Sequence, residues 1–427
     1  MKKWFVFMLA GALVIAMTVP ASAQIEHIFG GYWRTRAFLQ RQFSGDDTKT
    51  ADISRTDTRT RLYYTAKFTD NFKFVNKFEF DAVWGDTGYG KIGADGVNLE
   101  IKNSYADFTT GMVRTTLGVQ GYVIGRGFVF DDDASGIVIR WMTPMGNVPF
   151  YWLKAHEAGT GSESWDQDVD MFGIKPVLKV TDMITLTPYI HWWYSNDASS
   201  SPQFNAQTDE VNLWYLGIDA DFKLDFASLW FTGIYNGGGV DIVNPVDNTT
   251  STQDREAYLL AAGGKGAVGP VGIHGQIFYA SGDKDADDKD KGFSTPAGDS
   301  YYWAEIMGQG TFDAGVSNGS PGNHPSNIWA VNIGVSYTLL EALKLTGDYW
   351  YAGYPEAQIR NDGKSVDSLG SEFDLKATYK IMDNLNLDLI AAYLFAGDAT
   401  ESGDPNADPS TSNKDPYEIG ARISLSF

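Results

Sequence analysis

Five arginines near the N-terminus have the type and spacing that suit binding of anions. Arg34 and Arg36 are two residues apart, and Arg55, Arg59 and Arg61 are also separated by even numbers of residues. Side chains two apart in a β-strand point to the same face. We therefore predict that the five guanidinium groups form a ladder along two neighbouring strands. A guanidinium group donates paired hydrogen bonds to carboxylates and phosphates, so such a ladder attracts anions.

Acidic residues on the same predicted face give the arginines a second role. Asp57 lies among them in the sequence, and Glu79, Asp81 and Asp107 share the inward parity of the strands that follow. Two interpretations stay open. In the first, the arginines pair with these acids and the charges cancel inside the wall. In the second, the ladder faces open water and selects anionic or sugar-acid solutes, because charged side chains that line a narrow passage set its ion selectivity.

A glycine-flanked arginine lies close to three consecutive acids. Arg126 has a glycine on either side, and Asp131, Asp132 and Asp133 follow in the same stretch. We place the stretch in a long loop, 125–136. If this loop folds inward, Arg126 and the three acids form a constriction or bind a cation. If it does not, these side chains are simply solvated at the surface.

The longest loop, 283–327, begins with acids and continues with apolar residues. Asp283, Asp285 and Asp287 match the start of an EF-hand, but its sixth position is Asp288 instead of glycine and its twelfth is Ser294 instead of glutamate. The motif therefore fails, and weak calcium binding and plain solvation both stay open. The large apolar residues of the loop are Tyr301, Tyr302, Trp303, Ile306 and Met307. A loop of this length is rarely slack, so we expect it to lid or plug the fold.

The sequence contains no catalytic constellation. It has no G-x-S-x-G nucleophile elbow, no H-E-x-x-H motif and no phosphate-binding loop. The five histidines lie far apart, without the spacing of metal ligands. They are His27, His156, His191, His274 and His324. We therefore predict a protein that is not an enzyme and that has no cofactor and no bound metal.

The elements that must position these residues are β-strands. From Phe72 to Trp84 aromatic and other apolar residues alternate with Lys73, Lys77, Glu79 and other polar residues. Eight short turns alternate with nine long polar loops along the chain, which is typical of a barrel whose apolar side faces lipid and whose polar side faces a wet lumen. The pattern predicts an all-β fold, a transmembrane antiparallel up-and-down β-barrel of about eighteen strands, give or take two. The loops are predicted at 43–53, 85–98, 125–136, 158–167, 196–209, 236–254, 283–327, 352–368 and 397–414.

The N-terminus has the features of an export signal. Lys2 and Lys3 precede an apolar stretch, and Ala21-Ser22-Ala23 is a small-residue cleavage site. We predict a cleaved signal peptide over residues 1–23 and a single barrel domain over 24–427. No later run of apolar residues is long enough for a transmembrane helix.

The last strand carries a sorting pattern. From Tyr417 to Phe427 every second residue is apolar, and the terminal residue is aromatic. This resembles the signal by which the barrel assembly machinery of the bacterial outer membrane recognises its substrates. We therefore expect that machinery as a partner, and the outer membrane as the location.

Composition agrees with such a barrel and excludes other classes. Aromatic residues make up 14% of the chain, with 46 glycines and no cysteine, and the mean hydropathy is −0.24. Without cysteine there is no disulfide framework, so we expect backbone ladders and lipid-facing packing alone to hold the fold. A net charge of −21 makes nucleic acid an unsuitable partner. The acids gather in the long loops, as expected for a cell-surface face beside lipopolysaccharide.

Short motifs resemble those of one porin family. Arg59-Thr60-Arg61, the stretch from Phe80 to Gly85 and the stretch from Asn103 to Phe108 resemble the alginate-export type of outer-membrane porin. The resemblance implies an electropositive pore that passes an anionic polysaccharide.

Three functions follow from this sequence. We expect first a porin for passive diffusion of small hydrophilic solutes, with anions as candidates. The alternatives are a dedicated exporter of an acidic polysaccharide and a plugged barrel that acts as a surface scaffold or adhesin. Assembly as a homotrimer stays open.

Overall fold

The computed structural model describes residues 25–46, 52–86, 88, 90–93, 98–158, 167–284, 289–296, 298, 301–360, 362–401 and 413–427. The predicted signal peptide, and Asp285, Asp287 and Asp288 of the EF-hand comparison, lie outside these residues. Within them no helix has the length and apolar character needed to cross a membrane.

The described residues form strands joined by turns and loops. The strands are β1 (Glu26–Arg41), β2 (Ile53–Thr69), β3 (Phe72–Val83), β4 (Asn98–Thr110), β5 (Val113–Ile124), β6 (Phe130–Thr143), β7 (Gly146–His156), β8 (Val169–Ile174), β9 (Val177–Lys179), β10 (Ile184–Ser195), β11 (Thr208–Lys223), β12 (Ala227–Val243), β13 (Thr250–Val268), β14 (Val271–Ala280), β15 (Lys289–Asp290), β16 (Ile328–Leu340), β17 (Leu343–Ile359), β18 (Ser365–Met382), β19 (Leu385–Ala396) and β20 (Tyr417–Ser426). A single 3₁₀ turn, η1 (Gly125–Gly127), lies between β5 and β6.

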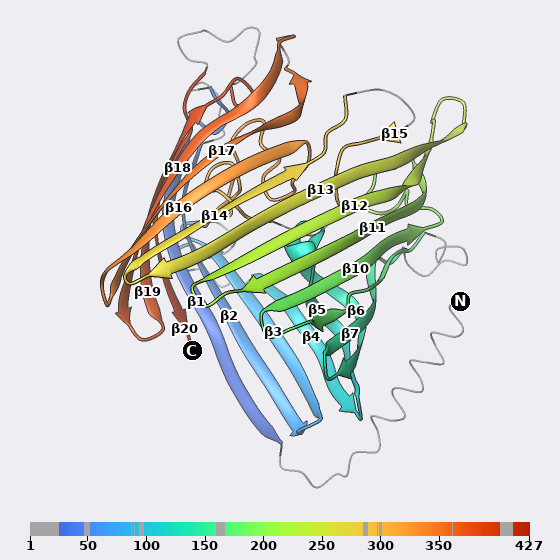
Figure 1. Ribbon diagram of the computed structural model, residues 1–427, viewed down its shortest axis with the longest axis horizontal. Coiled ribbons are helices and arrows are strands. Elements are labelled where there is room, and N and C mark those ends of the chain that lie inside the picture. The colour runs from blue at the N-terminus through green and yellow to red at the C-terminus, as the bar shows by residue number, and fades with distance from the viewer. Residues whose placement is uncertain are drawn as a thin grey trace.

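The strands close into a barrel (Figure 1). Apart from β8, β9 and β15, each strand pairs antiparallel with the strands before and after it in the wall, and β20 pairs with β1 from Tyr32↔Ser426 to Arg41↔Tyr417. Both β8 and β9 pair with β7 and β10, so they form one strand of the wall, interrupted near Pro176. Proline has no N–H to give to the ladder. The short β15 pairs in parallel with β13 inside a loop, so the barrel wall has 18 strands, as predicted.

Opposite faces of the strands meet different surroundings. In β18 the apolar Phe373 and Leu375 are 48% and 63% exposed, whereas Glu372 and Asp374 between and before them are buried. Exposed apolar side chains on the outside of a closed sheet suit hydrocarbon, and closure leaves no unpaired edge in the bilayer. The predicted division between lipid face and lumen face is therefore confirmed.

Three of the predicted loops are shorter than expected. The loop at 125–136 ends where β6 begins at Phe130, the loop at 236–254 shrinks to the turn between Val243 and Thr250, and β17 runs on to Ile359. The reason is strand length, because β13 has 19 residues and a tilted strand crosses a bilayer with about 9–11. The hairpins continue above the membrane with polar side chains that resemble loop sequence.

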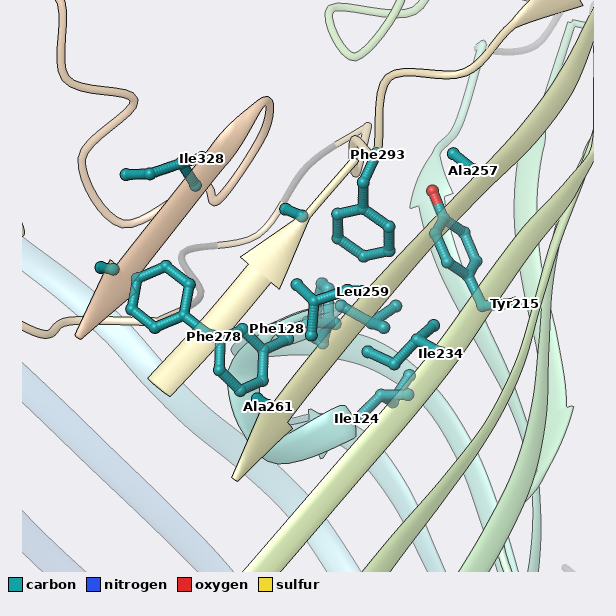
Figure 2. Close-up of a cluster of buried hydrophobic side chains, with 14 of the residues drawn as sticks. Ile124, Phe128, Tyr215, Ile234, Ala257, Leu259, Ala261, Phe278, Phe293 and Ile328 are labelled. Carbon is teal, nitrogen blue, oxygen red and sulfur yellow. The ribbon is translucent and has the colours of Figure 1, made fainter. Parts of the chain in front are cut away.

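A packed apolar cluster fills part of the barrel interior. Figure 2 shows Phe128 of the β5–β6 connection beside Leu259 of β13 and Phe278 of β14, and each of these side chains is at most 1% exposed. The expectation that ladders and lipid-facing packing alone hold the fold was wrong. Segments that fold into the lumen bring apolar side chains against the inner wall and exclude water there.

Candidate channel constriction

The chain between β5 and β6 turns into the lumen. Gly125, Arg126 and Gly127 have φ values of 59°, 56° and 94°, a left-handed conformation that non-glycine residues rarely adopt. A Cβ at Gly125 would lie 2.6 Å from Tyr189 Oη, so only glycine fits there. We call residues 125–129 the inner turn. Its Phe128 and Val129 are fully buried, so this connection folds inward, which is the first of the two alternatives left open by the sequence.

Arg126 fixes the inner turn to a distant part of the wall. Its guanidinium group lies 2.8 Å from Asp221 and 3.8 Å from Asp219 of β11. Its Nε donates to Thr232 Oγ1 of β12 at 3.0 Å, and it lies 5.3 Å from the centre of the Trp230 ring. The predicted constriction residue therefore bridges β5–β6 to β11–β12 inside the barrel.

The three acids predicted beside Arg126 lie elsewhere. Asp131, Asp132 and Asp133 belong to β6, because pairing between β5 and β6 continues up to Ile124↔Phe130. Asp133 accepts a hydrogen bond from Asn103 at 2.7 Å and lies 3.3 Å from Lys102. The prediction that these acids share the constriction loop with Arg126 was therefore wrong. Among the described residues, no three potential metal-binding side chains cluster together.

The described part of the long loop, residues 283–327, also enters the lumen and meets the inner turn. Tyr301 stacks on Phe128 with ring centres 3.9 Å apart, and its hydroxyl donates to Gln276 of β14 at 2.6 Å. Burial raises the pKa of Tyr301 to about 12, so its hydroxyl stays protonated at alkaline pH values at which an exposed tyrosine ionises. Trp303 packs edge-on against Trp350 of β17 at 5.1 Å. The loop thus follows the inner wall instead of standing in solvent.

Further along, the long loop is fastened to strands β18 and β1. The backbone N–H groups of Ile306 and Met307 donate to the Glu372 carboxylate at 2.6 and 2.9 Å. Phe312 stacks on Phe38 of β1 at 4.7 Å, and Arg36 donates to the Phe312 carbonyl oxygen. The described part of the loop therefore crosses the lumen from β14 to β1.

Three of the ladder arginines are paired with acids. Arg36 donates to both oxygens of Asp57 at 2.8 and 3.0 Å. Arg59 binds Asp81 at 2.6 Å and Glu79 at 3.1 Å, and Arg61 also donates to Glu79. These contacts join neighbouring strands β1, β2 and β3 and cancel most of the positive charge of the wall.

No ion pair joins the other two ladder arginines, Arg34 and Arg55, to another described residue. Arg34 is 8% exposed, its Nε has no hydrogen-bond partner in the described part of the chain, and its cross-strand neighbour is Arg59. Asp107, grouped with the ladder in the sequence, instead binds Arg114 at 2.7 Å. The wall therefore combines the two interpretations, since it is mostly neutralised but holds cations in excess.

Sequence reasoning missed the inward aromatic residues of β10 and β11. Tyr189 and Trp193 are 1% exposed, and Tyr215 is fully buried. His191 lies among them and pairs with Tyr151 Oη at 3.0 Å. The available signal was that large aromatic or apolar residues occur on both faces of these strands, which indicates burial on both faces. A lumen face covered by an inward segment has that pattern.

Solved structures with a similar fold come from Pseudomonas aeruginosa and Acinetobacter baumannii. OccK8 (OprE) of Pseudomonas aeruginosa has a TM-score of 0.56 at 10% sequence identity, covering 94% of this chain and 98% of that chain. OccAB4 of Acinetobacter baumannii has a TM-score of 0.57 at 10% identity, covering 96% and 100%. OpdK of Pseudomonas aeruginosa, solved with vanillate, has a TM-score of 0.57 at 9% identity, covering 94% and 98%. The fold is that of bacterial outer-membrane porins.

This outer-membrane barrel fold, together with the apolar exterior, places the chain in the outer membrane. No family model matches the sequence, and no curated protein matches it either. The alginate-export resemblance gains no support from the comparisons, and we treat it below as an alternative.

Proposed function

We propose that this barrel is a passive channel for small hydrophilic solutes and that it prefers anions. One observation carries the proposal. The inner turn and the described part of the long loop fold into the lumen of a porin barrel, and among the described residues Arg34 and Arg55 of its arginine wall have no acidic partner. The inward segments narrow the lumen. The uncompensated guanidinium groups raise the local concentration of anions, because charges act strongly in a narrow and weakly screened passage.

Conductance in planar bilayers tests this proposal. We expect stepwise insertion events, and a reversal potential in a salt gradient whose sign reports anion preference. Arg34→Gln should reduce that preference, because it removes an unpaired cation from the wall. Arg41→Gln is the matched control: it removes the same charge from the outer end of β1, where Arg41 lies 3.8 Å from Asp52. A folded barrel that conducts no ions contradicts the proposal.

Export of an acidic polysaccharide is the second candidate, and the arginine ladder is the observation that favours it. A dedicated exporter should show strong anion preference, and Arg59→Glu combined with Arg61→Glu should invert that preference. Transit of a charged oligosaccharide across the bilayer separates it from the small-solute channel. A plugged scaffold or adhesin, the third class, should conduct only after deletion of residues 283–327.

The proposal extends to processing and assembly. We propose that residues 1–23 are removed on export, that the barrel assembly machinery recognises the strand ending at Phe427, and that lipopolysaccharide surrounds the acidic outer loops. We propose no catalytic role. A homotrimer is the proposed assembly, and mass measurement of the purified protein in detergent tests it.

A further inference from the structure

A cavity of about 620 Å³ lies inside the barrel, away from the arginine wall. Its side is formed by β12, β13, β14, β16, β17 and β18, and residues 302–305 of the long loop, with Gly310 and Thr311, cover it. Its volume falls within the range of roughly 300–1,000 Å³ that is typical of sites for small molecules. The arginine ladder contributes no residue to it.

A positioned carboxylate faces this cavity. Asp348 Oδ1 accepts hydrogen bonds from His274 at 2.7 Å and from Asn332 at 3.0 Å. A Cβ on Gly334 would lie 2.2 Å from His274 Nε2 and 2.3 Å from Asp348 Oδ1, so the pair lies flat against β16 only because residue 334 is glycine. In the described part of the chain nothing binds Asp348 Oδ2. Two neighbours therefore orient the carboxylate and leave one oxygen to accept hydrogen bonds from a solute.

Aromatic rings form the apolar part of the same cavity. Trp303 of the long loop is half-buried, with its edge against Trp350 and its Nε1 donating to Gly322 at 2.9 Å. Tyr302 beside it is 41% exposed. Rings that are held in place but keep an accessible surface offer flat apolar contact area.

The charges of the cavity are mixed. Lys265 and Lys376 line it together with Glu305, Asp348 and Asp374, and Glu305 already accepts two hydrogen bonds from Thr311. No single sign dominates, so the site has no strong reason to select a small anion or a small cation. Dense donors and acceptors next to aromatic rings suit a molecule with many hydroxyl groups and apolar C–H faces.

We propose that this cavity binds a neutral sugar of one or two rings, with Asp348 as the acceptor of its hydroxyl groups and Trp303 as an apolar contact. This inference rests on the proposed channel function and names a class of solute for it. Sugar and ions then use different parts of the wall, since the arginines attract anions and the cavity forms hydrogen bonds with sugar hydroxyl groups.

Current block by added sugar tests the inference. In planar bilayers, glucose or maltose should reduce the wild-type ion current with saturation. Asp348→Ala should raise the half-saturating sugar concentration at least about tenfold, the effect of losing hydrogen bonds to a charged acceptor. Thr346→Val, a variant of similar volume, removes a hydroxyl group that lines the cavity and should weaken block by a smaller factor. Asp241→Asn, at the outer end of β12, should leave both current and block unchanged.

The outcomes separate the inference from the function on which it rests. Normal ion conductance with no saturable block by either sugar refutes the sugar site and leaves the channel intact. Stronger block by gluconate or lysine than by glucose also refutes it. Tryptophan emission of the purified protein gives a reading that needs no conductance, because Trp303 and Trp350 line the cavity. A silent barrel whose emission does not respond to sugar refutes both proposals.

Discussion

Substitution of Glu372 should release the long loop from the wall. Glu372 is fully buried and accepts the backbone N–H groups of Ile306 and Met307 at 2.6 and 2.9 Å. A hydrogen bond to a charged group contributes about 1.5–3 kcal/mol, so Glu372→Ala removes roughly 3–6 kcal/mol of anchoring. This is an upper bound, because burial of the carboxylate itself opposes it. Even about 2.8 kcal/mol shifts the equilibrium between docked and released loop about a hundredfold.

Single-channel recording measures this release. Glu372→Ala should give larger conductance steps and more frequent fluctuation between levels than the wild type. Glu372→Gln should lie between the two, because a neutral amide oxygen accepts weaker hydrogen bonds. The backbone ladders of the wall are untouched, so resistance of the barrel to unfolding in detergent should change little.

Glu210→Ala is the matched control, since Glu210 is an exposed glutamate near the outer end of β11. The reasoning fails if Glu372→Ala folds normally and shows the same step size and noise as the wild type. In that case other contacts, such as Phe312 against Phe38, are sufficient to hold the loop.

Three further predictions concern the inner turn, the ladder and the N-terminus. Gly125→Ala should destabilise the inner turn by about 1–2 kcal/mol through backbone conformation alone, and Tyr189→Phe should partly rescue it by removing the hydroxyl that lies 2.6 Å from the new Cβ; limited proteolysis in detergent reports both. Asp57→Asn should increase anion preference, because it frees Arg36 from its 2.8 Å ion pair, and an unchanged reversal potential contradicts this. Mass spectrometry of the exported protein should give Gln24 as its first residue, and a retained 1–23 segment overturns that assignment.

Much of the barrel wall could be predicted because its strands repeat a simple pattern. In β3 and β18 one face is apolar and the other charged, and that contrast directly reflects lipid on one side and water on the other. Short turns such as Gly269-Pro270 limit the connection between two strands. These are local properties, so they can be predicted from the sequence before the fold is known.

The arrangement of the constriction depends on contacts between distant residues. Arg126 meets Asp221, and Arg36 meets Asp57 only because the register of β1 and β2 pairs these positions. Neither partner can be chosen from spacing alone, because each arginine had several acids of suitable parity. The full length of the β12–β13 hairpin could not be predicted either, since its outer half has the polar composition of a loop.

The stack of Tyr301 on Phe128 has a consequence for how such a protein can diversify. The inner turn and the long loop come from separate regions of the chain and meet at this contact, and neither is part of the barrel wall. The two segments that narrow the lumen and the barrel wall around them are therefore built from different residues. Substitutions in these two segments can change which molecules pass, while the barrel wall keeps its assembly and its fit to the bilayer.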